Sequence, residues 1–419
     1  MMPLLHGAQA RAWVASVAAA AQDPVIALRV SEILGQVRQQ GDAALAELAE
    51  RFGDPAPRLL SSTERQSGAS SLGQSERQVL QQAAANIERF HQAVASSLAP
   101  VRLEQPEYSC GMRLQPVARV ACYAPGGRHP LPSTALMTGL AARAAGVPEI
   151  VLVCPNPHPA VLYAAELIGA DSFYQMGGAQ AVAALAYGTD TIPRVDMLVG
   201  PGNAYVAEAK RQLQGVIGID MLAGPSEVAI LADSGADPLW LALDLLAQAE
   251  HDPDARCCLL SWDEGLLDAV SQQIQQQLAH GPYPDFLRQS LDCSALLLLN
   301  DLDECLAALD QLAPEHLHLA VAEPLPLQER LQHYGGLFLG YHSTVPHGDY
   351  MAGPNHTLPT GTSARFSGGL SPLTFLRPQC WLHVPGPSPG LSRDTVTFAE
   401  LEGLHGHAAA ARARLEGRQ

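Results

Sequence analysis

The sequence predicts an α/β protein built on largely parallel sheets. From Val117 onward, short apolar β-like runs alternate with segments of helical periodicity. This alternation is typical of βαβ units, in which helices cover the faces of a parallel sheet. The chain of 419 residues is also too long for one ordinary hydrophobic core. We therefore expect two or more domains.

The expected elements follow from apolar periodicity and from local start and stop signals. The segment 23–40 places Val30, Ile33 and Val37 on one helical face, begins at Asp23–Pro24 and stops at Gly41. The other expected helices are 43–52, 75–94, 134–145, 159–168, 179–187, 204–213, 238–251 and 398–415. The expected strands are 117–123, 150–154, 197–199, 228–231, 257–260, 296–299, 317–321 and 337–339.

Glycine-rich turns mark the expected binding edge. They occur at 125–127, 177–180, 200–203 and 223–226, each after or nearly after an expected strand. Parallel sheets bind ligands at the carboxyl ends of their strands. Each turn alone could be a simple connection, but four within about a hundred residues favour one shared cleft. The chain has no clear GxGxxG dinucleotide fingerprint.

Composition excludes several classes of function. The formal net charge of −17 argues against nucleic-acid binding and against binding to anionic membranes. No apolar run approaches the roughly 18 residues of a membrane span, and the N-terminus does not resemble a secretory signal. The eight cysteines contain no CxxC pair and do not suggest a disulfide framework. We expect a cytoplasmic protein.

The segment 335–367 combines an apolar start with a long loop rich in histidine, proline and glycine. Asp349 and His356 lie in this loop, beside Gly348 and Gly353. Glycine permits sharp bends, so both side chains could point to one place. A converging Asp and His suit zinc or another divalent metal. A polar surface loop is the alternative interpretation.

Two further groups could take part in chemistry. Gln248 and His251 share a face in the last turn of an expected helix, where they could hold one metal ion, but without other support a polar helix end is the better interpretation. Glu315 and His316 precede an alternating strand and suit general acid–base catalysis. His318 lies on the same strand face and could instead be a packed histidine. Cys122 lacks an evident activating group, so we expect it to pack.

These stretches together resemble the histidinol dehydrogenase family. The motifs occur in the family's order and cover the chain from about residue 20, most strongly over 117–377. They are Tyr123-Ala-Pro-Gly-Gly with Pro132-Ser-Thr, Gly177-Gly-Ala-Gln-Ala, Val199-Gly-Pro-Gly-Asn-Ala-Tyr-Val, Asp220-Met-Leu-Ala-Gly-Pro-Ser-Glu, Gln248-Ala-Glu-His-Asp-Pro, Pro314-Glu-His-Leu, Gly348-Asp-Tyr, Gly353-Pro-Asn-His with Leu358-Pro-Thr, and Glu402-Gly-Leu-His-Gly-His.

The resemblance implies a role for each matching residue. It implies one zinc ion per subunit, bound by Gln248, His251, Asp349 and His407, and an acid–base pair of Glu315 and His316. It also implies that Ser226, His356 and Glu402 contact the substrate together with His316 and the zinc ligands. The implied NAD contacts are Tyr123, Gln180 and Asn203.

The resemblance further implies two incomplete Rossmann-like domains, a helical N-terminal arm and a small C-terminal domain. The arm would cover 1–20, the first Rossmann-like domain 21–119 and 228–357, the NAD-side domain 120–227 and the C-terminal domain 358–419. The family's intertwined homodimer, in which the tail completes the partner's site, would explain why Glu402 and His407 lie so far along the chain.

The implied reaction is the NAD-dependent oxidation of L-histidinol through its aldehyde to L-histidine. A related zinc dehydrogenase of another small alcohol, such as sulfopropanediol, is an alternative, because Thr344-Val345 and His347 depart from the family pattern. The tail also offers His405 beside His407, and spacing from Glu402 favours His407. A zinc hydrolase or a non-catalytic binding protein would leave the glycine-rich turns or the Glu315–His316 pair unexplained.

Overall fold

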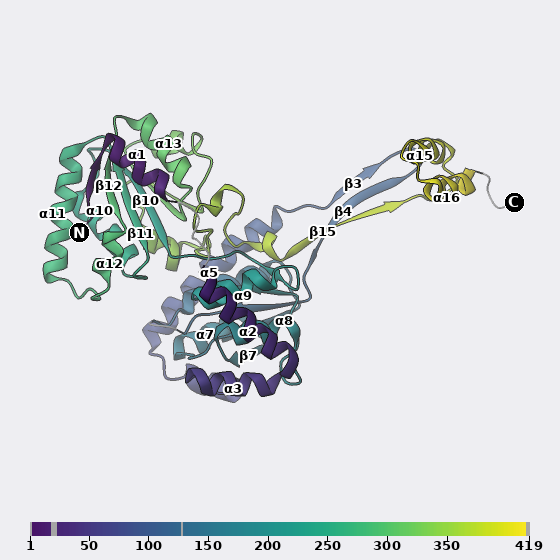
Figure 1. The fold of residues 1–419 in the computed structure, drawn as a ribbon, viewed down its shortest axis with the longest axis horizontal. Coiled ribbons are helices and arrows are strands. Elements are labelled where there is room, and N and C mark those ends of the chain that lie inside the picture. The colour runs from purple at the N-terminus through teal and green to yellow at the C-terminus, as the bar shows by residue number, and fades with distance from the viewer. Residues whose placement is uncertain (1, 18–22, 127–128, 416–419) are drawn as a thin grey trace.

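The structure is a computed structural model that describes residues 2–17, 23–126 and 129–415. Within these residues the chain forms two six-stranded, mainly parallel sheets and a three-stranded antiparallel sheet. Figure 1 shows two α/β bodies and a long arm that projects away from them and carries the C-terminal helices. The predicted α/β class with parallel-rich sheets is confirmed.

The first sheet has the strand order β1-β12-β11-β10-β13-β14, and all its pairings are parallel. Its strands are β1 (Leu4–His6), β10 (Glu227–Ala232), β11 (Arg256–Ser261), β12 (Ala295–Leu298), β13 (His316–Ala320) and β14 (Gly336–Leu339). One face is covered by α10 (Pro238–Ala249), α11 (Glu264–His280) and α12 (Leu287–Asp292). The other is covered by α1 (Gly7–Ser16), α13 (Leu302–Leu312) and α14 (Pro324–Gln328).

The second sheet has the order β2-β7-β6-β5-β8-β9, with only β2 antiparallel to its neighbour among the described strands. Its strands are β2 (Arg58–Leu59), β5 (Arg119–Tyr123), β6 (Glu149–Val153), β7 (Ser172–Gln175), β8 (Met197–Val199) and β9 (Gly218–Ile219). One face carries α2 (Pro24–Gln40), α3 (Asp42–Phe52), α8 (Gly178–Tyr187) and α9 (Ala204–Leu213). The other carries α4 (Ser62–Ala69), α5 (Gln74–Ser96), α6 (Pro132–Ala144) and α7 (Pro159–Ile168).

The sheets divide the chain differently from the division expected from the sequence. Helices α2 to α5 pack on the second sheet rather than on the first, because both apolar faces of that parallel sheet need helical cover. Residues 4–16 are not a separate arm, since β1 adds an edge strand to the first sheet and α1 packs beside α13. Residues 1 and 18–20 of the expected arm lie outside the described residues.

The arm is made of β3 (Val101–Glu104), β4 (Ser109–Pro116) and β15 (Leu376–His383). Residues 101–116 therefore belong with the C-terminal region rather than with either parallel sheet. The helix expected at 398–415 is two helices, α15 (Pro389–Leu401) and α16 (His405–Leu415). Gly403, with φ of +72°, ends the first of them, because a left-handed residue stops helical hydrogen bonding.

The expected helices from 23 to 251 and all eight expected strands are present within a few residues of their predicted ends. The sequence reasoning missed the arm strands and β1, β2, β7 and β9, which are short or lie at sheet edges. It also missed α1, α4 and α11 to α14. None of the helices in the described part of the chain has the length and apolarity that a membrane span requires.

Candidate active site

Glu315 and His316 lie at the amino-terminal edge of the first sheet, at the start of β13. Both side chains are buried, with 6% and 4% of their surface exposed. The neighbouring strand β10 begins at Glu227, and its main chain holds both residues. Glu227 N donates to Glu315 Oε2 at 2.8 Å, and Glu227 O lies 3.0 Å from His316 Nδ1. The register that pairs Val228 with His316 fixes this arrangement.

The ring of His316 lies between two carboxyl groups. Its Nδ1 lies 3.4 Å from Glu315 Oε2, and its Nε2 lies 3.7 Å from Asp349 Oδ1. Burial lowers the pKa of His316, but the carboxylates of Glu315 and Asp349 outweigh it and raise the pKa to about 10. Because a carbonyl oxygen only accepts, Nδ1 carries hydrogen and donates to Glu227 O. The buried Nε2 has no hydrogen-bond partner among the described residues, so it is the ring atom left for a ligand.

Asp349 reaches this place from a π-helical turn, η1 (His347–Ala352). Two glycines shape the turn as expected. A side chain on Gly348 would place its Cβ 2.7 Å from the ring of Phe338, and Gly353 has a φ of +107°. Asn86 of α5 anchors the turn by donating to Met351 O at 2.8 Å. The turn therefore fixes Asp349 toward His316 through contacts from a distant helix.

His356 lies beside the same turn. Its Nδ1 is 3.0 Å from Asp349 O, and its Nε2 is 3.5 Å from Thr134 Oγ1 in α6. Burial raises the pKa of Asp349, but the adjacent ring of His316 and the charges of the other nearby histidines outweigh burial, so the net shift of the Asp349 pKa is downward. Burial lowers the pKa of His356. The loop thus brings the ring of His356 to the main chain of Asp349.

Gln248 and His251 lie at the carboxyl end of α10, which runs back to the same edge of the sheet. Gln248 is buried, and its Nε2 has no hydrogen-bond partner among the described residues. Rotating the amide by 180° would put its oxygen there, where it could bind a cation. His251 is exposed and acts electrostatically on Asp349. An amide, an imidazole and a carboxylate are donor types that fit zinc.

The two tail residues are not part of this cluster in the same chain. Glu402 ends α15, His407 lies in α16, and both are exposed. Figure 1 places these helices at the far end of the arm, away from β10 and β11. Within the described ranges, no three His, Cys, Asp or Glu side chains gather closely enough to hold a metal ion. His407, the fourth residue expected to bind the metal, is therefore absent from this cluster in one chain.

The residues expected to contact NAD lie at the carboxyl edge of the second sheet. Tyr123 ends β5, and its buried hydroxyl accepts from Gly178 N at 3.1 Å; burial raises its pKa to about 12. Gln180 is buried in α8 and donates to Asp54 Oδ2 at 3.1 Å. Asn203 follows β8, is exposed, and caps α9 by accepting from Tyr205 N and Val206 N. Gly127 of the first turn lies outside the described residues.

The fit to a dinucleotide rests on this edge. Helices α6, α7, α8 and α9 all begin there, and helix amino termini favour phosphate groups. A cavity of about 690 Å³ opens beside the turns that follow β5 and β6, and Gly126, Asn156 and His158 are among its lining residues. The other lining residues are Arg58, Leu60, Glu64, His129, Pro130, Pro157, Pro159, Leu162 and Gln175.

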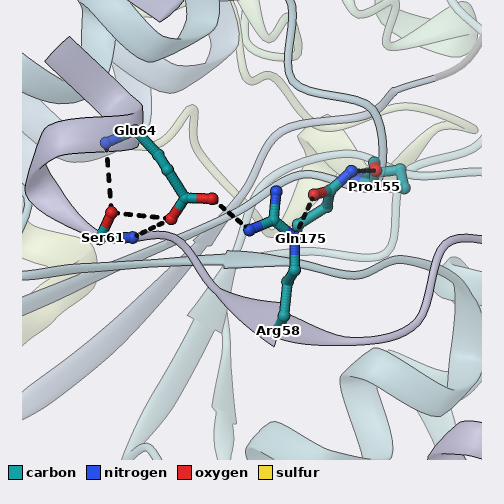
Figure 2. Close-up of polar contacts among 5 residues, drawn as sticks. All are labelled: Arg58, Ser61, Glu64, Pro155 and Gln175. Atoms are coloured by element: carbon teal, nitrogen blue, oxygen red, sulfur yellow. Dashed lines mark hydrogen bonds and ion pairs between the residues drawn. The ribbon is translucent and has the colours of Figure 1, made fainter. Parts of the chain in front are cut away.

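One wall of this cavity is a polar network that ties β2 to β7 (Figure 2). Arg58 donates to Glu64 Oε1 at 2.5 Å and to Gln175 Oε1 at 3.1 Å. Gln175 in turn donates to Pro155 O at 3.3 Å, in the turn after β6. Ser61 and Glu64 form the capping box of α4. The network therefore holds the cavity wall in a fixed shape.

The residues expected to bind the cofactor and those expected to act on the substrate lie at opposite ends of their strands. The residues expected to contact NAD lie at carboxyl ends of strands, whereas Ser226, Glu315 and His316 lie at amino ends of β10 and β13. Residues 220–226 connect β9 to β10 and so join the two edges. Gly224 N in this connection donates to Thr360 Oγ1 at 2.6 Å. The glycine-rich segment 223–226 is thus an inter-sheet connection rather than a βα turn.

Several expected packing roles are confirmed, and one departure from the family pattern has a structural explanation. Cys122 is fully buried, and burial raises its pKa to about 12. His318 is buried, with Nε2 at 3.0 Å from Gly340 O. Thr344 donates to Asp244 Oδ1 at 2.6 Å, and Val345 packs in the apolar core between the first sheet and helices α10 to α12. His347 is exposed.

Sequence reasoning missed Glu227, whose main chain holds the acid–base pair. Its side chain is buried, accepts from Gly361 N at 3.2 Å and lies 3.7 Å from Arg256 Nη1. Burial and the charge of Glu315 raise the pKa of Glu227 to about 7. Its position directly after Ser226, in a motif already singled out, was the available signal.

Comparison with known proteins gives a consistent result. Residues 18–415 match the family described as histidinol dehydrogenase. The chain is 42% identical to the histidinol dehydrogenase of Nitrosomonas europaea, over 94% of each chain. It is 44% identical to that of Thermus thermophilus, over 92% of this chain and 94% of the relative. The crystal structure of histidinol dehydrogenase from Elizabethkingia anophelis has a TM-score of 0.92 at 33% identity, covering 99% of this chain and 98% of that one.

Proposed function

The chain belongs to the histidinol dehydrogenase family, and we propose that it oxidises L-histidinol to L-histidine with two molecules of NAD. The observation that carries the proposal is the buried pair Glu315 and His316, which the main chain of Glu227 holds against Asp349. Buried acid–base groups beside an unpartnered ring nitrogen are typical of a catalytic site.

The first oxidation converts the alcohol to an aldehyde. His316 Nε2 accepts the hydroxyl proton while the carbon transfers hydride to NAD, which gives NADH. This role requires the neutral ring, which a cation on Asp349 would favour by offsetting one of the charges that raise the pKa of His316. A zinc ion on Gln248, His251, Asp349 and His407 would hold the amino alcohol in place and offset the negative charge of Asp349. His356, beside Asp349, and Ser226, directly before β10, would orient the substrate.

The second oxidation needs a water molecule. Glu315 accepts a proton from water as its oxygen adds to the aldehyde carbon, which gives a hydrate. The hydrate carbon then transfers hydride to a second NAD, and the product is the carboxylate of L-histidine. The overall balance is L-histidinol plus two NAD and water to L-histidine, two NADH and protons.

The NAD site that we propose is the carboxyl edge of the second sheet. Tyr123, Gln180 and Asn203 lie there, and the connection 220–226 joins that edge to Ser226 and Glu227. Parallel α/β sheets bind nucleotides at this kind of edge. The helix amino termini at this edge would face the phosphates.

We further propose an intertwined homodimer in which the tail completes the partner subunit's site. Glu402 and His407 lie on exposed helices at the end of the arm, and the ligand set of one chain is incomplete. Large apolar side chains are exposed on the same helices, among them Phe398 at 64% and Leu401 at 81%. Exposed apolar groups of this size favour an interface.

A mixing experiment tests the tail in trans. The variants His316→Asn and His407→Ala are each expected to be inactive. Random subunit exchange between them forms mixed dimers in which one of the two sites is intact, so activity should return to about a quarter of wild type. Inactivity of the exchanged mixture, with mixed dimers verified by differential tagging, would contradict the arrangement.

The main test of function is NADH formation from L-histidinol and NAD, with and without a chelator. We expect two NADH per histidinol, loss of activity with the chelator and recovery with zinc. Turnover of sulfopropanediol but not of histidinol would replace the substrate assignment.

We propose a cytoplasmic location, because all eight cysteines are free thiols and five of them are buried.

A further inference from the structure

Lys210 is the only lysine among the 25 basic residues of the chain, and every other one is arginine. It lies in α9 and is almost completely buried, with 1% of its surface exposed. A buried cation is costly unless it is paired, and lysine is a residue type that almost never becomes fully buried alone. Lys210 is therefore not a solvated surface lysine, and its burial needs another explanation.

Lys210 and Asp220 both form hydrogen bonds with the main chain of Gly200. Lys210 Nζ donates to Gly200 O at 3.0 Å and to Asp220 Oδ1. Asp220 Oδ2 accepts from Gly200 N at 2.8 Å. The side chains are 2% and 0% exposed, so solvent does not screen the pair. Both polar main-chain groups of Gly200 are thus fixed by one buried ion pair.

The conformation of Gly200 leaves little freedom. Its φ is +107°, and a Cβ at this position would lie 2.2 Å from Tyr123 O. Glycine is the residue type that adopts this backbone region without strain. The turn leads directly to Asn203, the exposed cap of α9. The ion pair therefore sets the path of the turn between the end of β8 and Asn203.

Stability alone does not account for the pair. Replacing a buried ion pair with well-packed apolar groups is often neutral or stabilising, because both charges must be stripped of water. The ammonium head of lysine is a compact charge with three donors, and here it donates to two acceptors at once. These properties suit a device that fixes one turn.

We propose that Lys210 and Asp220 are positioning residues that hold the turn 200–203 in the shape required for NAD binding. The inference rests on the proposed NAD role of this turn. Asp220 also begins the connection 220–226 that leads to Ser226, so the same pair ties the cofactor edge to the start of the substrate side. Neither side chain touches a reacting atom, since both are enclosed beneath the turn.

The test is the double variant Lys210→Met/Asp220→Asn. It removes both charges together, and the asparagine oxygen can still accept from Gly200 N. We expect a folded protein with unchanged thermal unfolding and zinc content. KM for NAD should rise roughly tenfold, which corresponds to about 1.4 kcal/mol of lost binding, while kcat and KM for histidinol change much less.

The matched control is Arg119→Met/Glu149→Gln. This ion pair, at 2.6 Å, lies at the opposite edge of the same sheet, where β5 and β6 begin. It should leave KM for NAD unchanged. Wild-type KM for NAD in the Lys210/Asp220 double variant would overturn the inference. Absence of NAD-dependent turnover in the wild-type enzyme would instead refute the proposed function.

A second variant tests the inference if the double variant does not fold. Asp220→Glu keeps both charges but lengthens the side chain by one methylene, which displaces the oxygen that accepts from Gly200 N. Its KM for NAD should also rise, with kcat little affected, and equilibrium binding of NADH followed by fluorescence should weaken in parallel. Unchanged KM and unchanged NADH binding in this variant would likewise overturn the inference.

Discussion

Glu227 makes the stability of the protein depend on pH in a direction opposite to that of an ordinary carboxylate. Its side chain is 12% exposed and lies beside Glu315. Burial and that neighbouring charge raise its pKa from 4.5 to about 7. The folded protein therefore binds a proton at Glu227 more tightly than the unfolded chain does, so the folded state is favoured when this carboxyl is protonated.

The magnitude follows from the size of the shift. One pKa unit corresponds to about 1.4 kcal/mol, so a shift of roughly 2.5 units corresponds to about 3 kcal/mol. This stability is fully present below pH 4.5 and is lost progressively as the pH rises to about 7. The variant Glu227→Gln carries no charge at any pH. Its stability advantage over wild type should grow across this window to about 3 kcal/mol at pH 8.

The assay is urea unfolding of both proteins at equal subunit concentration, at half-unit steps from pH 4.5 to 8. Subtracting the two curves cancels the titrating groups that do not interact with Glu227, so the difference reports Glu227 together with its neighbour Glu315. Glu208→Gln is the pH-independent control, because a hydrogen bond from Arg211 lowers the pKa of Glu208 from 4.5. The contribution of Glu208 is lost only as the pH falls below about 4.5, so the difference between this variant and wild type should stay nearly constant over the scanned range. A difference between Glu227→Gln and wild type that does not change with pH would refute the reasoning.

Three further predictions concern the site. Glu315→Gln should slow aldehyde oxidation by about 10²–10⁴-fold and alcohol oxidation much less, because only the second oxidation needs a proton taken from water. Separate assays on histidinol and histidinal would measure the two rates. Equal losses in both assays would contradict the role assigned to Glu315. His316→Asn should slow the first oxidation by about 10²–10⁴ with thermal unfolding unchanged, and a small effect would remove His316 as the base. Gly353→Ala should destabilise the loop by about 1–3 kcal/mol, because Gly353 has a φ of +107° and a Cβ there would lie 2.8 Å from Asn86 O. Isothermal titration should then show weaker zinc binding. Zinc affinity equal to that of wild type would argue against the loop's role in binding the metal.

Much of the fold could be predicted because its signals are local. The apolar run at 228–231 is β10, and the periodicity at 23–40 is α2. The arm could not be predicted, since β4 pairs with β15 across more than two hundred and fifty residues and neither strand is a continuous apolar run. The single helix expected at 398–415 is wrong, because Gly403, with φ of +72°, separates α15 from α16. Edge strands such as β1 carry too few residues to give a pattern.

The candidate site divides in the same way. Glu315 and His316 are adjacent in the chain, so the sequence alone placed them together. Their positioning by the main chain of Glu227 depends on the register between β10 and β13. Lys210 was not singled out from the sequence, although it is the only lysine, and its pairing with Asp220 beneath Gly200 appears only in three dimensions.

The sequence by itself determined the element types, the parallel α/β class and the kinds of side chain available for chemistry, because these depend on periodicity, turn residues and donor type. The tertiary structure decided which helices cover which sheet and that Asp349 meets His316 Nε2 at 3.7 Å. It also carried Glu402 and His407 to the end of an arm, away from that pair. Such contacts join residues far apart in the chain, and only packing and strand register fix them.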